Sequence, residues 1–185
     1  MTTVLLLAHP QFATSRVNRA LLDGLDDSPG LEVADLYALY PDGQVDYTVE
    51  RERILRAHRL VLQFPLYWYS TPPLLKHWQD VVLTPLFYGE PDIAASTRGL
   101  PLLVATTTGG PPASYRSDSL IGLSITELFA PLRATARRCG WLWQAPFAVH
   151  DVRNLDDAAL ARAARDYRSA VAATPTSRQT TGAAA

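Results

Sequence analysis

Residues 60–82 read LVLQFPLYWYSTPPLLKHWQDVV and combine two apolar segments with an unusual loop between them. Its apolar start at 60–64 predicts a buried strand, and the apolar residues from Leu74 to Val82 recur at the spacing of one helix face. A loop between two such elements is normally polar. Here the loop carries three consecutive aromatic residues, Tyr67 to Tyr69, between flanking prolines. The stretch therefore predicts a strand, a stiff aromatic loop and a helix, in that order.

The same alternation continues along the chain. The predicted strands are residues 4–8, 31–36, 60–64, 100–105 and 141–149, and the predicted helices are 16–25, 49–57, 71–83, 121–138 and 155–172. Residues 84–98 show no clear period. Strands that alternate with helices predict an α/β domain, in which helices cover both faces of a parallel sheet. Five strands fit the flavodoxin-like order 2-1-3-4-5. We expect one domain over residues 1–173 and a disordered polar tail at 174–185.

Charge and composition exclude several kinds of partner and site. The 185 residues carry a net charge of −1, so no long-range field favours nucleic acid or an anionic membrane. Cys139 is the only cysteine, which excludes an internal disulfide and a cysteine-based metal site, and we expect no metal. The N-terminus lacks the basic segment of a signal peptide, and no apolar run reaches the length of a membrane span. We expect a soluble cytoplasmic protein.

Ligands of such sheets bind at the carboxyl ends of the strands, near the switch point of the strand order. This rule selects the loops at 9–16, 65–71 and 106–119. The first loop ends with Ser15 just before a helix, where a hydroxyl beside free N–H groups forms an anion site. The alternative is that Ser15 only caps the helix, which is the commoner use of such a serine. His9 is weak evidence alone, since a histidine at a strand end is more often structural.

The loop that begins TTTGGPPASY, residues 106–115, combines glycines with hydroxyl groups. Gly109 and Gly110 permit positive φ and let a ligand approach the backbone closely. A plain turn is the equally weighted alternative for Gly-Gly before Pro-Pro. Tyr115 could donate a hydrogen bond or a proton, or it could be a surface or interface residue.

The aromatic loop is expected to be rigid. Pro65 fixes φ at its start, and Pro72 and Pro73 preset the first turn of the following helix. Ser70 or Thr71 is the expected N-cap of that helix.

The backbone of the aromatic loop offers groups for binding. The N–H groups of residues 66–69 have no obvious ladder partner, which suits a flat aromatic ligand with polar edges. Burial under residues 84–98, or in a dimer interface, is the equally weighted alternative. One ligand would use all three loops: a flavin nucleotide with its phosphate on the first loop and its ring between the other two.

Five segments of the chain resemble the flavodoxin-like NAD(P)H:quinone oxidoreductases. They are AHPQFATSRVNRALL (8–22), DLYALYPDGQVD (35–46), QFPLYWYSTPPLLKHWQDVV (63–82), TTTGGPPASY (106–115) and CGWLWQAPFAVH (139–150). The resemblance covers roughly residues 3–170, and the third segment is the most specific. Within this family the chain is most similar to a short bacterial branch, which contains the ancillary subunits of glutathione-regulated potassium-efflux systems.

The resemblance implies a set of residues that contact a bound flavin. It implies phosphate contacts from His9, Ser15, Asn18 and the backbone near Val17. It implies ring contacts from Pro65, Leu66, Tyr67, Trp68 and Tyr69, and contacts to the other edge of the ring from Thr107, Thr108, Gly109 and Gly110.

Tyr115 matches a tyrosine that takes part in proton handling in longer members of the family. Those members pair it with a nearby histidine. The corresponding segment here, RSDSLIGL at 116–123, has no histidine. We therefore expect Tyr115, or water, to act without a histidine partner.

The resemblance also implies a cofactor, substrates and an oligomeric state. The chain length favours FMN, and FAD is the alternative. NAD(P)H would pass a hydride to flavin N5 and leave, and a quinone would then take the hydride in the same pocket, in a two-electron ping-pong reaction. The family is typically homodimeric.

Two other functions remain as alternatives. The protein could be a regulatory subunit that docks on a potassium-efflux transporter, with secondary redox activity, at the inner face of the cell membrane. Docking would be protein to protein, because the sequence has no basic patch or anchoring helix. A one-electron carrier of the flavodoxin type is disfavoured by the net charge of −1, since such carriers use a strongly acidic surface to steer towards partners.

Overall fold

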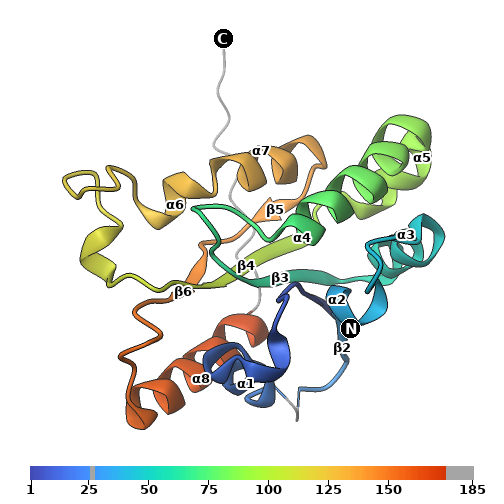
Figure 1. Ribbon diagram of the computed structural model, residues 1–185. Helices are drawn as coiled ribbons and strands as arrows, with labels where there is room; N and C mark the ends of the chain where they lie inside the picture. The colour runs from blue at the N-terminus through green and yellow to red at the C-terminus, as the bar shows by residue number, and fades with distance from the viewer. Residues whose placement is uncertain (26–27, 174–185) are drawn as a thin grey trace.

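The strands follow the order that the sequence predicts. The structure is a computed structural model that describes residues 1–25 and 28–173 (Figure 1). Its strands run in the order β2-β1-β3-β4-β5, and a further strand, β6, also pairs with β4. This is the expected flavodoxin-like arrangement. The tail expected to be disordered, 174–185, lies outside the described residues.

All pairs of these strands are parallel, so β1, β2, β3, β4 and β6 end at one common edge of the sheet, whereas β5 pairs only with the start of β4. The strands are β1 (Thr3–Leu7), β2 (Leu31–Asp35), β3 (Arg59–Pro65), β4 (Pro101–Thr107), β5 (Leu142–Trp143) and β6 (Phe147–Val149). Every residue of β3 is buried, as expected of a central strand with helices on both faces. Pro65 at the end of β3 lies beside Thr107 at the end of β4.

The prediction of one continuous strand over 141–149 is wrong, because the structure has two short strands in this range. β5 pairs with the start of β4, and β6 pairs with its end, from Ala105 to Thr107. Ala145 and Pro146 lie between the two segments. Proline has no N–H to donate to the ladder, so the strand breaks there.

The helices form one layer on each face of the sheet (Figure 1). They are α1 (Arg16–Asp23), α2 (Leu36–Leu39), α3 (Tyr47–Arg56), α4 (Pro73–Trp78), α5 (Pro91–Ala94), α6 (Ile125–Leu128), α7 (Ala130–Arg138) and α8 (Asp157–Ala172). Leu5 and Leu7 of β1 pack in a core with α1 and α8. Val4 and Leu6 point the other way, into a larger core with α3, α4 and α7. Within the described ranges, no helix has both the length and the apolar content that a membrane crossing requires.

Residues 84–98, which show no period in the sequence, are largely helical. The chain continues from α4 in π-helical form over Gln79–Leu83 (η2) and Pro85–Gly89 (η3), and the short α5 and the 3-10 turn η4 (Ala95–Thr97) follow. A π-helix bonds residue i to residue i+5. Its apolar residues therefore do not follow the 3.6-residue repeat from which an α-helix is predicted.

The helix predicted over 121–138 begins later and is broken. Gly122 has φ +69, and Ser124 forms a capping box with Glu127 at the start of α6. α6 ends at Leu128, and α7 begins at Ala130 with Pro131 in its first turn. A proline is tolerated there because the first N–H groups of a helix have no intrahelical acceptor.

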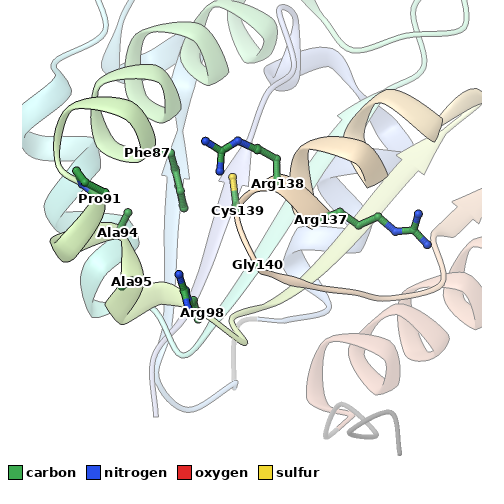
Figure 2. A pocket seen from close by; sticks show the side chains of 9 residues that line it. All are labelled: Phe87, Pro91, Ala94, Ala95, Arg98, Arg137, Arg138, Cys139 and Gly140. Carbon is green, nitrogen blue, oxygen red and sulfur yellow. The ribbon is translucent and has the colours of Figure 1, made fainter. Parts of the chain in front are cut away.

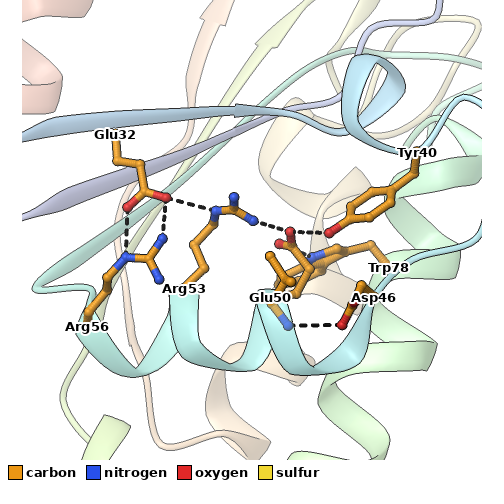
Figure 3. Close-up of polar contacts among 8 residues, drawn as sticks. Glu32, Tyr40, Asp46, Glu50, Arg53, Arg56 and Trp78 are labelled. Carbon is orange, nitrogen blue, oxygen red and sulfur yellow. Dashed lines mark hydrogen bonds and ion pairs between the residues drawn. The ribbon is translucent and has the colours of Figure 1, made fainter.

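One buried carboxylate connects the second strand with the helices of the larger core (Figure 3). Glu50 of α3 is fully buried and accepts hydrogen bonds from the Tyr40 hydroxyl at 2.7 Å and the Trp78 indole N–H at 2.9 Å. It also pairs with Arg53, which in turn donates to Glu32 of β2 at 2.9 Å. Burial of a charge is tolerated only with such compensation.

We predict that replacing this carboxylate destabilises the protein. Glu50→Ala leaves Tyr40 and Trp78 without their acceptor in the core and removes one of the two carboxylates that pair with Arg53, so the free energy of unfolding should fall by about 3 kcal/mol. Glu52→Ala, two residues along the same helix, removes only an exposed pair with Arg51 and should change it by less than about 0.5 kcal/mol. Urea denaturation of both variants measures the difference, and equal losses would contradict the role of Glu50.

Candidate functional site

A cleft of about 590 Å³ opens at the carboxyl edge of the sheet. Ten of the predicted site residues line it: His9, Ser15, Val17, Asn18, Pro65, Leu66, Tyr67, Thr107, Thr108 and Gly109. The other four, Trp68, Tyr69, Gly110 and Tyr115, lie outside its lining. The three loops selected from the sequence thus meet in one place, because β1, β3 and β4 are parallel neighbours.

The N-terminus of α1 supplies donors to this cleft. Ser15 is the N-cap, and its hydroxyl oxygen accepts from the backbone N–H of Asn18 at 3.4 Å. The capping role weighed in the sequence is therefore present. In the described part of the chain, the N–H groups of Arg16 and Val17 have no acceptor. Free N–H groups at the positive end of a helix dipole form an anion site.

Asn18 is buried at the base of the cleft and has one unused oxygen. Its side-chain amide donates to the Ser15 hydroxyl at 3.2 Å and to the Thr107 hydroxyl at 3.0 Å. Its Oδ1 has no hydrogen-bond partner among the described residues. A buried acceptor without a partner is costly, and this oxygen is closed to solvent in the structure.

His9 presents a donor to the same end of the cleft. The backbone N–H of Gln11 donates to its Nδ1 at 3.1 Å. Burial lowers the pKa of His9 below its ordinary value of 6.5, so the ring is neutral at pH 7. With Nδ1 used as an acceptor, the hydrogen-bond pattern assigns the proton to Nε2, where it can be donated to an anion.

The aromatic loop is a tight hairpin with a strained backbone. Tyr67 and Ser70 exchange two backbone hydrogen bonds, each 3.0 Å long. The two residues between them have positive φ, 46° for Trp68 and 65° for Tyr69. Two-residue turns of this kind normally use Asn-Gly, because a left-handed conformation is unfavourable for residues with a large side chain. Backbone strain of this kind occurs preferentially at functional sites.

Only part of this loop has free backbone donors, which corrects the expectation for residues 66–69. The N–H of Leu66 extends the sheet ladder to the carbonyl of Thr107 at 2.8 Å, and the N–H of Tyr67 bonds Ser70. Among these four residues, the N–H groups of Trp68 and Tyr69 are the ones without an acceptor in the described structure. The strained turn therefore presents two adjacent donors.

The helix after the loop starts later than predicted. Neither Ser70 nor Thr71 caps α4; the N-cap is Pro72, without a side-chain hydrogen bond. The backbone of Ser70 is held in the hairpin, which removes it from the helix start. The proposed burial under residues 84–98 is also wrong, because the side chain of Trp68 is 92% exposed.

In the loop after β4, the expectation that Gly109 and Gly110 adopt positive φ is wrong. Neither Gly109 nor Gly110 is among the positive-φ residues. A Cβ at Gly109 would meet nothing within 4 Å, and a Cβ at Gly110 would lie 3.4 Å from the Tyr115 hydroxyl. Gly109 therefore leaves the backbone open to the cleft, where a ligand ring can approach it.

A fourth loop, after β6, belongs to the site and was not selected from the sequence. The N–H groups of Asp151 and Val152 bond the carbonyls of Gly110 and Thr108 at 2.9 and 3.1 Å. Val152 and Arg153 line the cleft. The signal that could have found this loop is its position, since the last strand of the sheet ends at the same carboxyl edge.

Tyr115 has a histidine neighbour, although the segment that follows it in the sequence has none. Its ring lies 5.2 Å from that of His150, at the end of β6. Nδ1 of His150 lies 3.0 Å from the Thr108 hydroxyl, which itself donates to the Gly110 carbonyl at 2.9 Å. The Thr108 hydroxyl has one proton, which it donates to Gly110, so it can only accept from His150. Nδ1 of His150 therefore carries the hydrogen, and Nε2 is left as an acceptor. Burial lowers the pKa of His150, which keeps the ring neutral at pH 7.

A second cavity, of about 380 Å³, lies near the amino ends of β4 and β5 (Figure 2). No predicted site residue lines it. Burial raises the pKa of the Cys139 thiol at its wall to about 12, so this thiol is not a reactive thiolate. Arg137 and Arg138 are in the last turn of α7, where cations complement the helix dipole. Structural roles account for these residues.

Comparison with known protein families gives one match over nearly the whole chain. A family model described as having a flavodoxin-like fold, Flavodoxin_2, matches residues 1–171. The glutathione-regulated potassium-efflux system ancillary protein KefF of Klebsiella pneumoniae is 40% identical over 166 residues, which are 89% of this chain and 92% of that protein.

Many solved structures have similar folds, including three from different organisms. A chain in the structure of a thermophilic tryptophan halogenase from Streptomycin violaceusniger has a TM-score of 0.87 at 37% identity, covering 92% of this chain and 99% of that one. General stress protein 14 of Treponema denticola in complex with FMN has a TM-score of 0.82 at 34% identity, with coverages of 92% and 98%. An NAD(P)H:quinone oxidoreductase from Methanothermobacter marburgensis has a TM-score of 0.67 at 25% identity, with coverages of 92% and 96%. These names differ in activity, so the shared fold does not by itself assign a reaction.

We predict that relaxing the aromatic turn stabilises the protein. Trp68→Asn places a residue that tolerates positive φ at an exposed position, so the free energy of unfolding should rise by about 1 kcal/mol. Trp68→Phe keeps the strained conformation with an aromatic ring and should leave stability unchanged. Chemical denaturation of the protein without ligand measures both variants. The same stability for the two would indicate that the turn is not strained.

Proposed function

Since the chain belongs to the Flavodoxin_2 family, whose members have a flavodoxin-like fold, we propose that it is a flavin-dependent NAD(P)H:quinone oxidoreductase that binds FMN in the cleft at the carboxyl edge of its sheet. One observation carries this proposal. Free backbone donors at the start of α1 border a cleft whose walls combine apolar side chains with Gly109, and the strained turn with two more donors, Trp68 and Tyr69, directly follows Tyr67 of the cleft lining.

The phosphate of FMN fits the start of α1. The N–H groups of Arg16 and Val17, the Ser15 hydroxyl and Nε2 of His9 all donate, and a phosphate only accepts. FAD would need room for an adenosine beyond this end of the cleft, and FMN needs no such extension.

The flavin ring fits between the aromatic loop and the backbone at Gly109. Pro65, Leu66 and Tyr67 give an apolar wall, and the N–H groups of Trp68 and Tyr69 offer hydrogen bonds to a polar ring edge. When bound, FMN supplies the two-electron redox centre that takes a hydride from NAD(P)H and gives it to a quinone. NAD(P)H and quinone would use the same open face in turn, which is a ping-pong order.

Tyr115 and His150 are proposed to deliver the proton that completes the quinol. Reduction of a quinone takes up a hydride and one proton, and the proton must come from solvent. Nε2 of His150 is free to receive it, and the Tyr115 ring lies beside His150. The Tyr115 hydroxyl would then donate to the quinone oxygen on which negative charge develops.

A second copy of the chain is proposed to complete this site. Large apolar side chains on the loops at the carboxyl edge are exposed: Tyr67, Trp68, Tyr69, Leu120 and Leu123. Exposed apolar groups of this size gather at interfaces. A homodimer that covers them would also exclude water from the open face of the cleft.

A second candidate function follows from the 40% identity with the potassium-efflux ancillary protein KefF. In this candidate, the chain docks on a potassium-efflux transporter at the inner face of the membrane, and redox activity is secondary. The exposed aromatic turn could then contact the transporter. The two candidates differ in whether the isolated protein turns over a quinone.

We predict that the purified protein reconstituted with FMN oxidises NADH or NADPH and reduces a simple benzoquinone, with one quinol formed for each nicotinamide oxidised. Initial rates at varied donor and acceptor concentrations should give parallel double-reciprocal lines, as expected of a ping-pong order. Absence of turnover with either donor and several quinones would refute the proposed function. Co-purification with a transporter in that case would favour the docking function.

We predict that removing the proton donors slows the reaction without loss of the cofactor. Tyr115→Phe and His150→Gln should each lower kcat by about 10- to 100-fold, with FMN affinity retained. The wild-type rate should rise as the pH falls towards the pKa of His150, which lies below 6.5, because the protonated ring is the donor.

The pH dependence separates this role from a structural one. The low-pH rise should disappear in His150→Gln and persist in His77→Gln, which changes an exposed histidine on α4. A His150→Gln variant with the wild-type profile would contradict a proton-transfer role.

A further inference from the structure

We propose that Tyr167 of α8 is a positioning residue for the phosphate of the flavin, although it does not line the cleft. It acts through Gln63 of β3 on the first turn of α1. This inference rests on the proposed function, because it assumes that the phosphate binds at the start of α1. It adds a helix to the site that contributes no residue to the lining of the cleft.

A chain of buried hydrogen bonds connects the two places. The Tyr167 hydroxyl donates to Oε1 of Gln63 at 2.9 Å. Nε2 of Gln63 donates to the backbone carbonyl of Asn18 at 3.0 Å. The side chain of Asn18 continues to Ser15 and Thr107, both in the lining of the cleft.

Burial makes this chain rigid. Tyr167 and Gln63 are both 0% exposed, and Asn18 is 2% exposed. Water has no access to replace a lost partner, so each polar group depends on its neighbour in the chain. Burial also raises the pKa of Tyr167 far above its ordinary value of 10.0, so its hydroxyl keeps its proton and remains a donor. The ring itself is held by Phe147 of β6, at 5.1 Å between centroids.

Gln63 is placed where it can set the geometry of both halves of the site. It lies beside Leu7 of β1 and Ala105 of β4 in the sheet, two residues before Pro65 and the aromatic loop. Its amide holds the first turn of α1, where the phosphate donors are. One side chain thus connects the ring end of the cleft with the phosphate end, and the Tyr167 hydroxyl fixes the orientation of its amide.

The other contacts between α8 and α1 are weaker candidates for this role. Arg16 donates to the carbonyl of Leu155 at 2.7 Å and pairs with Asp157, and Arg168 donates to the carbonyl of Gly24 at 2.5 Å. These bonds are solvent-exposed. Exposed ion pairs contribute little, because water screens and competes with them. The buried contact through Gln63 therefore adds to the Asn18–Thr107 bond and to the apolar packing of Val17 in holding the first turn of α1.

The test compares two flavins that differ only in the phosphate. The dissociation constants of FMN and riboflavin are measured by flavin fluorescence for the wild type and for Tyr167→Phe, which removes only the hydroxyl. The variant should bind FMN about fivefold more weakly, as for one lost hydrogen bond, and should bind riboflavin as the wild type does. A purely structural role would change both affinities or neither.

Two further variants control for folding. Tyr40→Phe removes a buried hydroxyl on the other face of the sheet, and it should lower stability without changing the FMN-to-riboflavin ratio. Gln63→Met removes the amide at similar length and should reproduce the selective loss if Tyr167→Phe does not fold.

The outcomes separate the two proposals. Suppose that the wild type binds FMN and that in the variants the affinities for FMN and riboflavin change together or do not change. This result would overturn the role of Tyr167 and leave the proposed function intact. A wild type that binds neither flavin would refute the proposed function and this inference with it.

Discussion

The parallel pairing of β3 with β4 is the constraint on which the rest of the structure depends. It places Pro65 beside Thr107, so the aromatic loop and the glycine loop leave the sheet at the same point. The ladder continues one bond further, from the N–H of Leu66 to Thr107, and only then does the chain turn back. Both strands are buried between two helical layers, which leaves little freedom for either loop to move.

Strain and rigidity are combined at the carboxyl edge. The positive φ values of Trp68 and Tyr69 are unfavourable, and they persist because the surrounding backbone is held on both sides by the ladder and by the prolines before α4. The N–H groups of these two residues have no acceptor within residues 1–25 and 28–173. A relaxed turn such as Asn-Gly would be more stable and would present no aromatic surface, so stability and ligand binding favour different residues here.

Buried polar groups divide between the two layers of the fold. On one face, Glu50 connects α3 and α4 with the second strand, and its role is explained by stability. On the other face, Tyr167, Gln63 and Asn18 connect α8 with the end of the cleft formed by α1. The network of Tyr167 reaches the cleft, so it can affect the geometry of the cleft as well as the stability of the protein. The network of Glu50 does not reach the cleft, so its loss is expected to affect stability.

The sequence by itself determined the strand order and the three loops of the cleft, because periodicity and the carboxyl-end rule follow from the alternation of elements. The ten lining residues were predicted individually through the resemblance of those loops to a known family. The choice of Trp68 and Tyr69 as the donors without an acceptor among the described residues, and the pairing of Tyr115 with His150, required the tertiary structure. These features depend on which backbone groups find partners and on contacts between residues far apart in the chain. No local pattern encodes such contacts, because they are set by the register of the sheet.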